Sequence, residues 1–215
     1  SRYVHGIMAR VFSHQDILDL AKHGSVPVIN GLSDLLHPCQ ALADYFTLRE
    51  RRGTLEGLKV AYVGDGNNVA HELIFGAVKL GLAVSVASPQ GYEPNQLIVK
   101  SATREAQRLG APAPEVTADP YAAVEGADAV YTDVWTSMGQ EAESEARLSA
   151  FQGFAITEEL MAVASPEAVF MHCLPAHRGE EVSAEVADGP QSVIFDQAEN
   201  RLHVQKAIMM LLMAE

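Results

Sequence analysis

The segment His37-Pro38-Cys39-Gln40 places a histidine and a glutamine where a helical pattern begins. Exposed N–H groups and the helix dipole favour an anion or a polarised oxygen at such a position. An imidazole can stabilise a developing oxyanion there, and the Gln40 amide offers both a donor and an acceptor. A capping histidine beside a buried cysteine is the alternative interpretation of the same residues.

The segment His172-Cys173-Leu174-Pro175 ends an apolar run of strand length. A thiol at that position could be a nucleophile, a proton acceptor or inert core filling. Adjacent residues of a strand point to opposite faces, so His172 is poorly placed to activate Cys173. This argues against a covalent thiol mechanism.

The loop from Asp133 to Gly139 follows the apolar run 129–131. A carboxylate at the end of a strand can pair with a substrate ammonium group. Ser137 and the nearby backbone could hold a substrate carboxylate. An ordinary loop around a packed Trp135 explains the same residues.

The run Gly64-Asp65-Gly66-Asn67-Asn68-Val69 lies between a strand and a helix, as a dinucleotide fingerprint does. The third glycine of that fingerprint is replaced by Val69, and the next strand ends without an acid for a ribose. Both departures argue against NAD. Asn68 could instead project its amide into a crevice at the sheet edge, or the run could be only a tight turn.

Two arginines lie in apolar surroundings. Arg10 interrupts a strand-like run, and a buried arginine needs an anionic partner. Arg201 lies near the start of the last helical pattern. Each could also be a surface cation or part of an internal salt bridge.

Apolar runs of strand length alternate with helical patterns along the chain, which is typical of a parallel α/β sheet. We expect strands at 7–12, 26–30, 59–63, 83–87, 129–131 and 169–172. We expect helices at 15–23, 38–52, 96–109, 157–164 and 197–213, and one from the Gly64-Asp65-Gly66 turn to Leu80. Proline-containing linkers are expected around 112–120.

The chain is therefore expected to be an α/β protein with parallel sheets in two Rossmann-like units, the first one incomplete, joined by a bridging helix. Residues 1–45 would be the remnant of one domain, and residues 58–190 the fuller domain. The chain begins without Met and soon enters an apolar run, which suggests a chain entered midway.

Composition excludes several classes of function. The formal net charge of −13 argues against an extended nucleic-acid interface. The longest apolar run is too short to span a bilayer, and no signal peptide is visible, so no membrane partner is expected. The two cysteines form no C-x-x-C pair, which indicates neither zinc nor a disulfide framework and fits a reducing, cytoplasmic setting.

Taken together, the motifs resemble the aspartate/ornithine carbamoyltransferase superfamily, in its ornithine branch. The resemblance runs in order through almost the whole chain. Its segments are residues 9–12, Asn30-Gly31-Leu32-Ser33-Asp34, 37–40, 64–68, 133–139, 172–175 and Ala198-Glu199-Asn200-Arg201. The Ser137-Met138 pair is similar to the ornithine branch rather than the aspartate branch.

The resemblance implies roles for these positions. Arg10, His37 and Cys173 would be the catalytic residues. Carbamoyl phosphate would be bound by Arg10, His37, Pro38, Cys39, Gln40, Cys173, Leu174 and Arg201. Ornithine would be held by Asn68, Asp133, Ser137 and Met138. The last helix, 197–215, would return to pack on residues 1–45, and the complete protein would be a homo-oligomer, a trimer or a multiple of trimers.

The implied reaction belongs to arginine metabolism. The neutral δ-amine of L-ornithine would attack carbamoyl phosphate, a tetrahedral oxyanion would form against Arg10 and His37, and phosphate would leave with L-citrulline as the product. Catalysis would depend on positioning and electrostatic stabilisation, without metal or organic cofactor. Cys173 and Asp133 could help to deprotonate the ammonium group.

One departure from the family is visible. The family carries a Ser-x-Arg-Thr phosphate-binding motif in its first domain, and this sequence contains none. A non-catalytic ornithine-binding fragment is therefore an alternative. A carbamoyltransferase for another amine, such as putrescine, is a second alternative, although the Asp133-x-x-x-Ser137-Met138 pattern would then lack a carboxylate to hold. A nicotinamide oxidoreductase is the most distant one.

Overall fold

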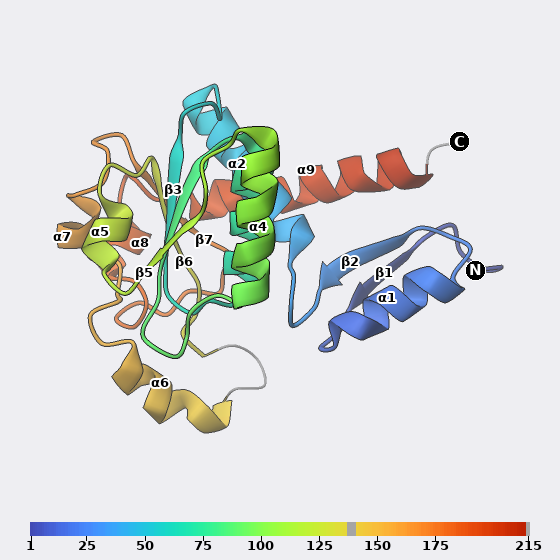
Figure 1. The fold of residues 1–215 in the computed structure, drawn as a ribbon, viewed down its shortest axis with the longest axis horizontal. Coiled ribbons are helices and arrows are strands. Elements are labelled where there is room, and N and C mark those ends of the chain that lie inside the picture. The colour runs from blue at the N-terminus through green and yellow to red at the C-terminus, as the bar shows by residue number, and fades with distance from the viewer. Residues whose placement is uncertain (137–140, 214–215) are drawn as a thin grey trace.

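The computed structural model describes residues 1–136 and 141–213 (Figure 1). Its first part is a two-stranded parallel sheet of β1 (Ile7–Arg10) and β2 (Val28–Leu32), connected through α1 (His14–His23). The expected strand 7–12 is two residues shorter in the structure, and the expected strand 26–30 lies two residues later in the chain. β1 ends early at a register shift between Ala9 and Arg10. β2 begins only after Pro27, which has no N–H to donate to a ladder.

The second part is a five-stranded sheet in the order β5-β4-β3-β6-β7, with every pair parallel. Its strands are β3 (Lys59–Val63), β4 (Ala83–Ala87), β5 (Glu115–Thr117), β6 (Ala129–Thr132) and β7 (Val169–His172). The chain leaves β3 toward β4 on one side and later enters β6 on the other. The carboxyl ends of β3 and β6 therefore flank a topological switch point, where open α/β sheets bind ligands.

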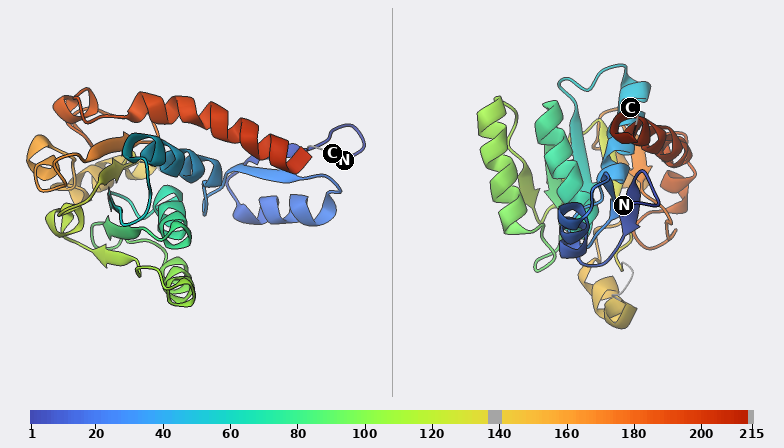
Figure 2. Two further views of the ribbon diagram at one scale, coloured as in Figure 1. Left: turned by 90° about the horizontal axis from the view of Figure 1, so that it is seen from above. Right: turned by 90° about the vertical axis from the view of Figure 1, so that its right-hand side faces the viewer.

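Helices cover both faces of this sheet (Figures 1 and 2). They are α3 (Asn68–Leu80), α4 (Gln96–Leu109), α5 (Pro120–Val124), α7 (Glu158–Met161) and α8 (Ala184–Ala187). The helix α6 (Ser144–Ala150), preceded by a 3-10 turn η1 (Glu141–Glu143), lies beyond the ends of the strands (Figure 1). The sequence reading missed β5, α5, α6 and α8. The expected helix 157–164 is only the four-residue α7, and Pro166 soon afterwards disfavours helical backbone before it.

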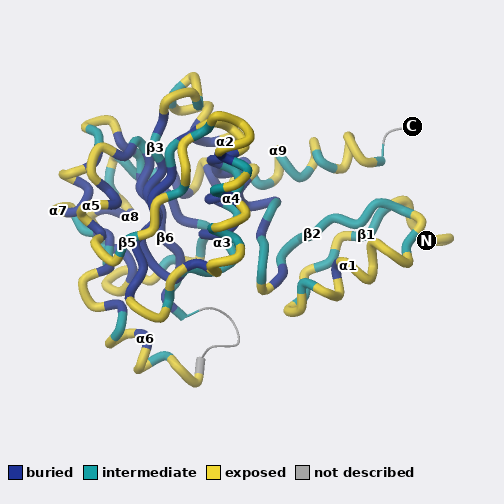
Figure 3. Tube along the Cα trace, viewed as in Figure 1, coloured by how far each residue is buried: buried dark blue, intermediate teal, exposed yellow. Residues whose placement is uncertain are grey.

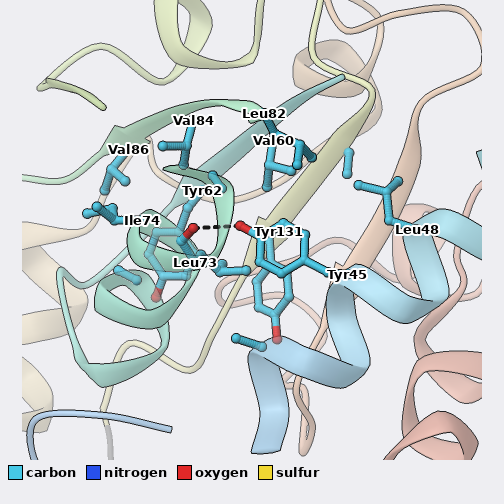
Figure 4. Close-up of a cluster of buried hydrophobic side chains, with 14 of the residues drawn as sticks. Tyr45, Leu48, Val60, Tyr62, Leu73, Ile74, Leu82, Val84, Val86 and Tyr131 are labelled. Carbon is cyan, nitrogen blue, oxygen red and sulfur yellow. Dashed lines mark hydrogen bonds between the residues drawn. The ribbon is translucent and has the colours of Figure 1, made fainter. Parts of the chain in front are cut away.

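The core consists of two layers, one on each side of the five-stranded sheet. Val60 and Tyr62 of β3 face α2 (Pro38–Arg52), α3 and α4, whereas Ala61 and Val63 face α5, α7 and α8. The central strands are buried on both faces (Figure 3), which explains their continuous apolar runs. Figure 4 shows the first layer, in which the Tyr45 hydroxyl donates to the Leu73 carbonyl oxygen at 2.5 Å.

The bridging helix α2 (Pro38–Arg52) connects the two parts of the chain and has the limits that the sequence predicts. Proline occupies its first turn, and Gly53 ends it in the left-handed conformation at φ 74°. The ring of Tyr45 packs so closely on α3 that a Cβ at Gly76 would lie 2.2 Å from it. This close contact attaches α2 to the second part.

The last helix, α9 (Ile194–Met213), packs along α2 and extends beside the two-stranded sheet (Figure 2). It begins three residues before the expected start at residue 197, because Ile194 is buried in the second core layer and docks the first turn. Its C-terminal end packs on Gly6, because a Cβ atom added to Gly6 would lie only 2.6 Å from the Met213 sulfur.

Within the described residues, none of the helices combines the length and the apolar character that crossing a membrane requires.

Candidate active site

A cavity of about 510 Å³ lies between the two-stranded sheet and the switch point of the larger one. Eight of the predicted site residues line it: Arg10, His37, Gln40, Asn68, Asp133, Cys173, Leu174 and Arg201. Pro38 and Cys39 do not line it; they form the first turn of α2, and the Cys39 thiol faces the Asn30 carbonyl oxygen at 3.4 Å. Ser137 and Met138 lie outside the described residues. Another hollow, beside α1, is lined by none of the motif residues.

Arg10 lies at the rim of this cavity, at the end of β1. Of the alternatives that the sequence left open for Arg10, the structure shows the surface cation, because its side chain is exposed. Arg201 enters from α9 and donates to Gln40 Oε1. The cavity thus holds two guanidinium groups, which suits an anionic ligand.

His37 is buried at the entrance of α2, with 5% of its surface exposed. Burial, then the charges of Arg201 and Arg10, lower its pKa to about 4. The imidazole is therefore neutral at pH 7. It makes no capping hydrogen bond to α2, so the alternative of a capping histidine is not observed. A neutral ring beside two guanidinium groups can donate a hydrogen bond to a ligand oxygen.

Gln40 has a fixed amide orientation. Its Nε2 donates to Asp44 Oδ1 at 2.8 Å, so its oxygen remains directed at Arg201. Asp44 Oδ1 also accepts from Gln197 Nε2 at 2.6 Å, and Gln197 Oε1 accepts from the His172 backbone N–H at 3.0 Å. Burial raises the pKa of Asp44 to about 7, although its bonds with Gln40 and Gln197 oppose the shift. This buried network joins α2, α9 and β7.

Asp133 and Cys173 form a direct contact at the ends of β6 and β7. The Cys173 thiol donates to Asp133 Oδ1 at 2.9 Å. Burial, and then the Asp133 charge, raise the pKa of Cys173 well above its ordinary value. The group is thus a thiol at neutral pH, and thiols are poor nucleophiles.

His172 organises the loop that follows β7. Its Nδ1 accepts from the Leu174 N–H at 2.8 Å, and its Nε2 lies 3.3 Å from Glu181 Oε1. Leu174 has the left-handed φ of 61°, which is uncommon for a non-glycine residue. Burial would raise the pKa of Glu181, but its bonds with His172 and the His177 N–H lower it. Glu181 therefore anchors both ends of the cavity-lining loop.

Among the described residues, two clusters hold side chains of types that bind metals. Potential ligand atoms of Asp133, His172 and Cys173 lie within 4.8 Å of one another. His172 Nδ1 accepts from the Leu174 N–H, its Nε2 lies 3.3 Å from Glu181 Oε1, and the Cys173 thiol is bonded to Asp133, so each of these groups already faces a protein group. His177, Glu180 and Glu181 form the second cluster, in which only Glu181 is buried.

Asn68 spans the two parts of the chain. Its Nδ2 donates to the Ser33 carbonyl oxygen at 2.7 Å, and no group in the described part of the chain donates to its Oδ1. A second contact joins α3 to the same loop: His71 Nδ1 lies 2.9 Å from the Leu35 carbonyl oxygen. The start of α3 is thereby attached to the loop after β2.

Several residues that support the site were missed by sequence reasoning. Asn67 donates to Asp133, and Gln197 donates to the buried Asp44. Glu181 accepts from the His177 N–H. Arg147 and Asp65 form a buried ion pair at 2.9 Å. Only Asn67 carried a usable local signal, since asparagine before a helix is a preferred N-cap. The others read as ordinary polar positions of surface helices and loops.

A doubly wound sheet with a polar cavity at its switch point is typical of α/β enzymes that bind small ligands. Two family models match the chain: "Aspartate/ornithine carbamoyltransferase, carbamoyl-P binding domain" over residues 1–50 and "Aspartate/ornithine carbamoyltransferase, Asp/Orn binding domain" over residues 56–212. The chain belongs to the aspartate/ornithine carbamoyltransferase family. This confirms the resemblance seen in the motifs.

Individual relatives carry ornithine in their names. The ornithine carbamoyltransferase of Symbiobacterium thermophilum is 62% identical over 214 residues, which are 100% of this chain and 69% of that protein. The anabolic ornithine carbamoyltransferase of Pyrococcus furiosus is 58% identical over 99% of this chain and 67% of its own length.

Solved structures confirm the predicted α/β fold class. The ornithine carbamoyltransferase structure from Pyrococcus furiosus has a TM-score of 0.94 at 57% identity, covering 99% of this chain and 67% of that one. The one from Gloeobacter violaceus has a TM-score of 0.92 at 46% identity, covering 99% and 71%.

Proposed function

We propose that this chain binds carbamoyl phosphate and L-ornithine in the cavity between its two parts and transfers the carbamoyl group to the δ-amine, giving L-citrulline and phosphate. The observation that carries the proposal is the convergence of eight motif residues, from both sheets and α9, on one cavity. The names of the relatives, all ornithine carbamoyltransferases, support the choice of substrate.

The carbamoyl phosphate end of the cavity is the one that holds Arg10, His37, Gln40 and Arg201. Two guanidinium groups supply the positive charge for a phosphate. The neutral His37 ring donates to the carbonyl oxygen and stabilises the oxyanion, as Arg10 does. Gln40 presents its oxygen, because Asp44 holds its nitrogen, and an oxygen is the acceptor that the carbamoyl NH₂ group needs.

The ornithine end is formed by Asn68, Asp133 and Cys173, with Ser137 and Met138 assigned to it by the family resemblance. Asp133 attracts the substrate's ammonium charge. Transfer needs a neutral δ-amine, so a proton must leave before attack. The carboxylate of Asp133 and the Cys173 sulfur, 2.9 Å apart, are the groups that we assign to this step.

We further propose that residues 1–45 together with α9 form the carbamoyl phosphate domain and residues 58–190 the ornithine domain, a division supported by the two family-model ranges. We assign the reaction to arginine biosynthesis in the cytoplasm, since the chain has two free cysteines and a named anabolic relative. We also propose that the chain assembles with copies of itself as a homotrimer or a multiple of trimers.

A citrulline assay tests the proposal. The purified chain is mixed with carbamoyl phosphate and either ornithine or putrescine, and each product is quantified. We expect citrulline only. Arg201→Ala should reduce the rate by roughly a hundredfold, because one charged ligand contact is lost, whereas Arg104→Ala, an exposed arginine of α4, should leave it unchanged.

A second measurement separates the alternatives. The absence of a Ser-x-Arg-Thr motif favours an ornithine-binding protein without transfer activity. Calorimetric titration of ornithine without carbamoyl phosphate addresses that case. Binding without citrulline would replace transfer by binding as the function, and a product from putrescine alone would refute the choice of ornithine.

A further inference from the structure

Asn67 makes two sets of hydrogen bonds that leave its amide only one orientation. Its Oδ1 accepts from the backbone N–H groups of Val69 at 2.9 Å and Ala70 at 3.2 Å, which caps α3. Its Nδ2 donates to Asp133 Oδ2 at 2.7 Å. Rotating the amide by 180° would set its oxygen against a carboxylate and its NH₂ group against two N–H donors. The helix cap therefore determines where the donor points.

Asp133 is correspondingly held from two sides. Its Oδ1 accepts from its neighbour, the Val134 N–H, at 2.8 Å and from the Cys173 thiol at 2.9 Å. Among the described residues, Asn67 is the hydrogen-bond donor to Oδ2. Without it, rotation about the Cβ–Cγ bond of Asp133 would be restrained on one edge of the carboxylate only.

We propose that Asn67 is a positioning residue, which couples the N-terminal cap of α3 to the Asp133 carboxylate and holds that carboxylate in the plane that receives the amino groups of the substrate. The substrate half of this inference rests on the proposed function. The orientation of Asp133 by Asn67 does not depend on it.

The test uses Asn67→Ser, with Asn95→Ser as its matched control. Serine caps helices about as well as asparagine does, so both variants retain a capping oxygen. Asn95 caps α4 through the Leu97 N–H at 2.8 Å and is exposed. Both variants should unfold at similar temperatures, whereas only Asn67→Ser removes the donor to Asp133.

The first readout is the alkylation rate of Cys173 at fixed pH, resolved by peptide mass spectrometry. Burial, and then the adjacent Asp133 charge, raise the pKa of Cys173, so releasing Asp133 from its 2.9 Å contact with the thiol should speed alkylation by on the order of threefold to tenfold. The rate for the buried Cys39 reports general opening and should not change. Equal Cys173 rates in Asn67→Ser, Asn95→Ser and the parent chain would overturn the inference.

The second readout is ornithine affinity by calorimetry. Loss of a hydrogen bond to a charged group should weaken it by roughly tenfold or more in Asn67→Ser only. If ornithine does not bind to the parent chain but the Cys173 rate still responds, the positioning role stands and the proposed function fails. If ornithine binds equally well to both variants, the positioning of Asp133 for the substrate is refuted.

Asn67→Asp gives a pH signature that a purely structural role would lack. At low pH the new carboxyl group and Asp133 would share a proton, which restores a hydrogen-bond donor to Asp133. The ornithine affinity of Asn67→Asp should then be close to that of Asn95→Asp and of the parent chain. As pH rises the pair repels and affinity should fall. Among the described residues, the other titratable or charged groups around this pair are the same in both variants: Tyr62, Asp65, Tyr131, Arg147, Cys173 and Glu181. A constant ratio across pH would contradict the proposal.

Discussion

Asp44 illustrates how a single residue can set both the stability and the geometry of the site. It lies fully inside the protein, where its Oδ1 holds the amides of Gln40 and Gln197. In the unfolded chain its pKa is the ordinary 3.8, and in the folded protein it is about 7. The folded state therefore binds more protons between these pH values.

This difference predicts the pH dependence of stability. The contribution of Asp44 is fully present below about pH 4 and declines as pH rises toward about 7, with a slope of roughly 1.4 kcal/mol per pH unit. Asp44→Asn should remove that slope, which urea unfolding at several pH values would reveal. Thr47→Val, which alters a neighbouring α2–α9 contact to Asn200, is the control and should keep it. Identical slopes in all three proteins would show that Asp44 titrates normally.

At the scale of elements, the turn between β3 and α3 is the most constrained connection of the site. Gly66 has no room for a side chain, because a Cβ there would lie 2.1 Å from the Pro94 nitrogen and 2.3 Å from the Glu93 carbonyl carbon. These are backbone atoms that cannot rotate away. The same turn presents Asn67 and Asn68 to the cavity, so its position affects the proposed ornithine site.

Gly66→Ala should therefore lower the free energy of unfolding by roughly 3 kcal/mol or more and reduce ornithine affinity. Gly57→Ala is the matched control. Gly57 has a positive φ of 77° but open space around it, so alanine there should cost only about 1 kcal/mol of backbone strain. Chemical denaturation measures both values. A similar cost at the two positions would mean that the turn can move away from Pro94.

Sequence reasoning was most accurate for elements whose ends carry their own signals. The limits 59–63, 83–87, 38–52 and 96–109 agree with the structure, and glycines follow both helices in the left-handed conformation. It failed for β5, a three-residue edge strand with exposed Glu115 and Val116, and for the short helices. A three-residue strand and helices of four to seven residues have too little periodicity to be distinguished from loops.

At the scale of the whole molecule, apolar surface is concentrated on the C-terminal half of α9 and on β1. Leu211 is 84% exposed, Met210 62% and Leu212 46%, and on β1 Met8 is 66% exposed. Figures 1 and 3 show that this half of α9 extends away from the larger sheet, beside β1 and β2. Contiguous exposed apolar surface indicates an association site. We assign it to other copies of this chain.

Sedimentation at several concentrations tests this assignment. We expect concentration-dependent association, and Met210→Gln combined with Leu211→Gln should weaken it by roughly tenfold, because the burial of two apolar side chains is lost. The matched control combines Leu97→Gln with Tyr121→Gln, two exposed apolar residues at α4 and α5. An equal effect of both pairs would indicate nonspecific aggregation, and a monomer at all concentrations would refute the proposal.

The sequence by itself determined the parallel α/β class, the family and eight of the residues that line the cavity. These depend on local periodicity and on motifs that are contiguous in the chain. Only the tertiary structure decided which groups are neutral, which amides are fixed and which arginine is exposed. Asp44 and Gln197 are 153 residues apart, and Asn67 and Asp133 are 66 apart. Hydrogen-bond direction and burial depend on such distant neighbours, so they become defined only when the chain has folded.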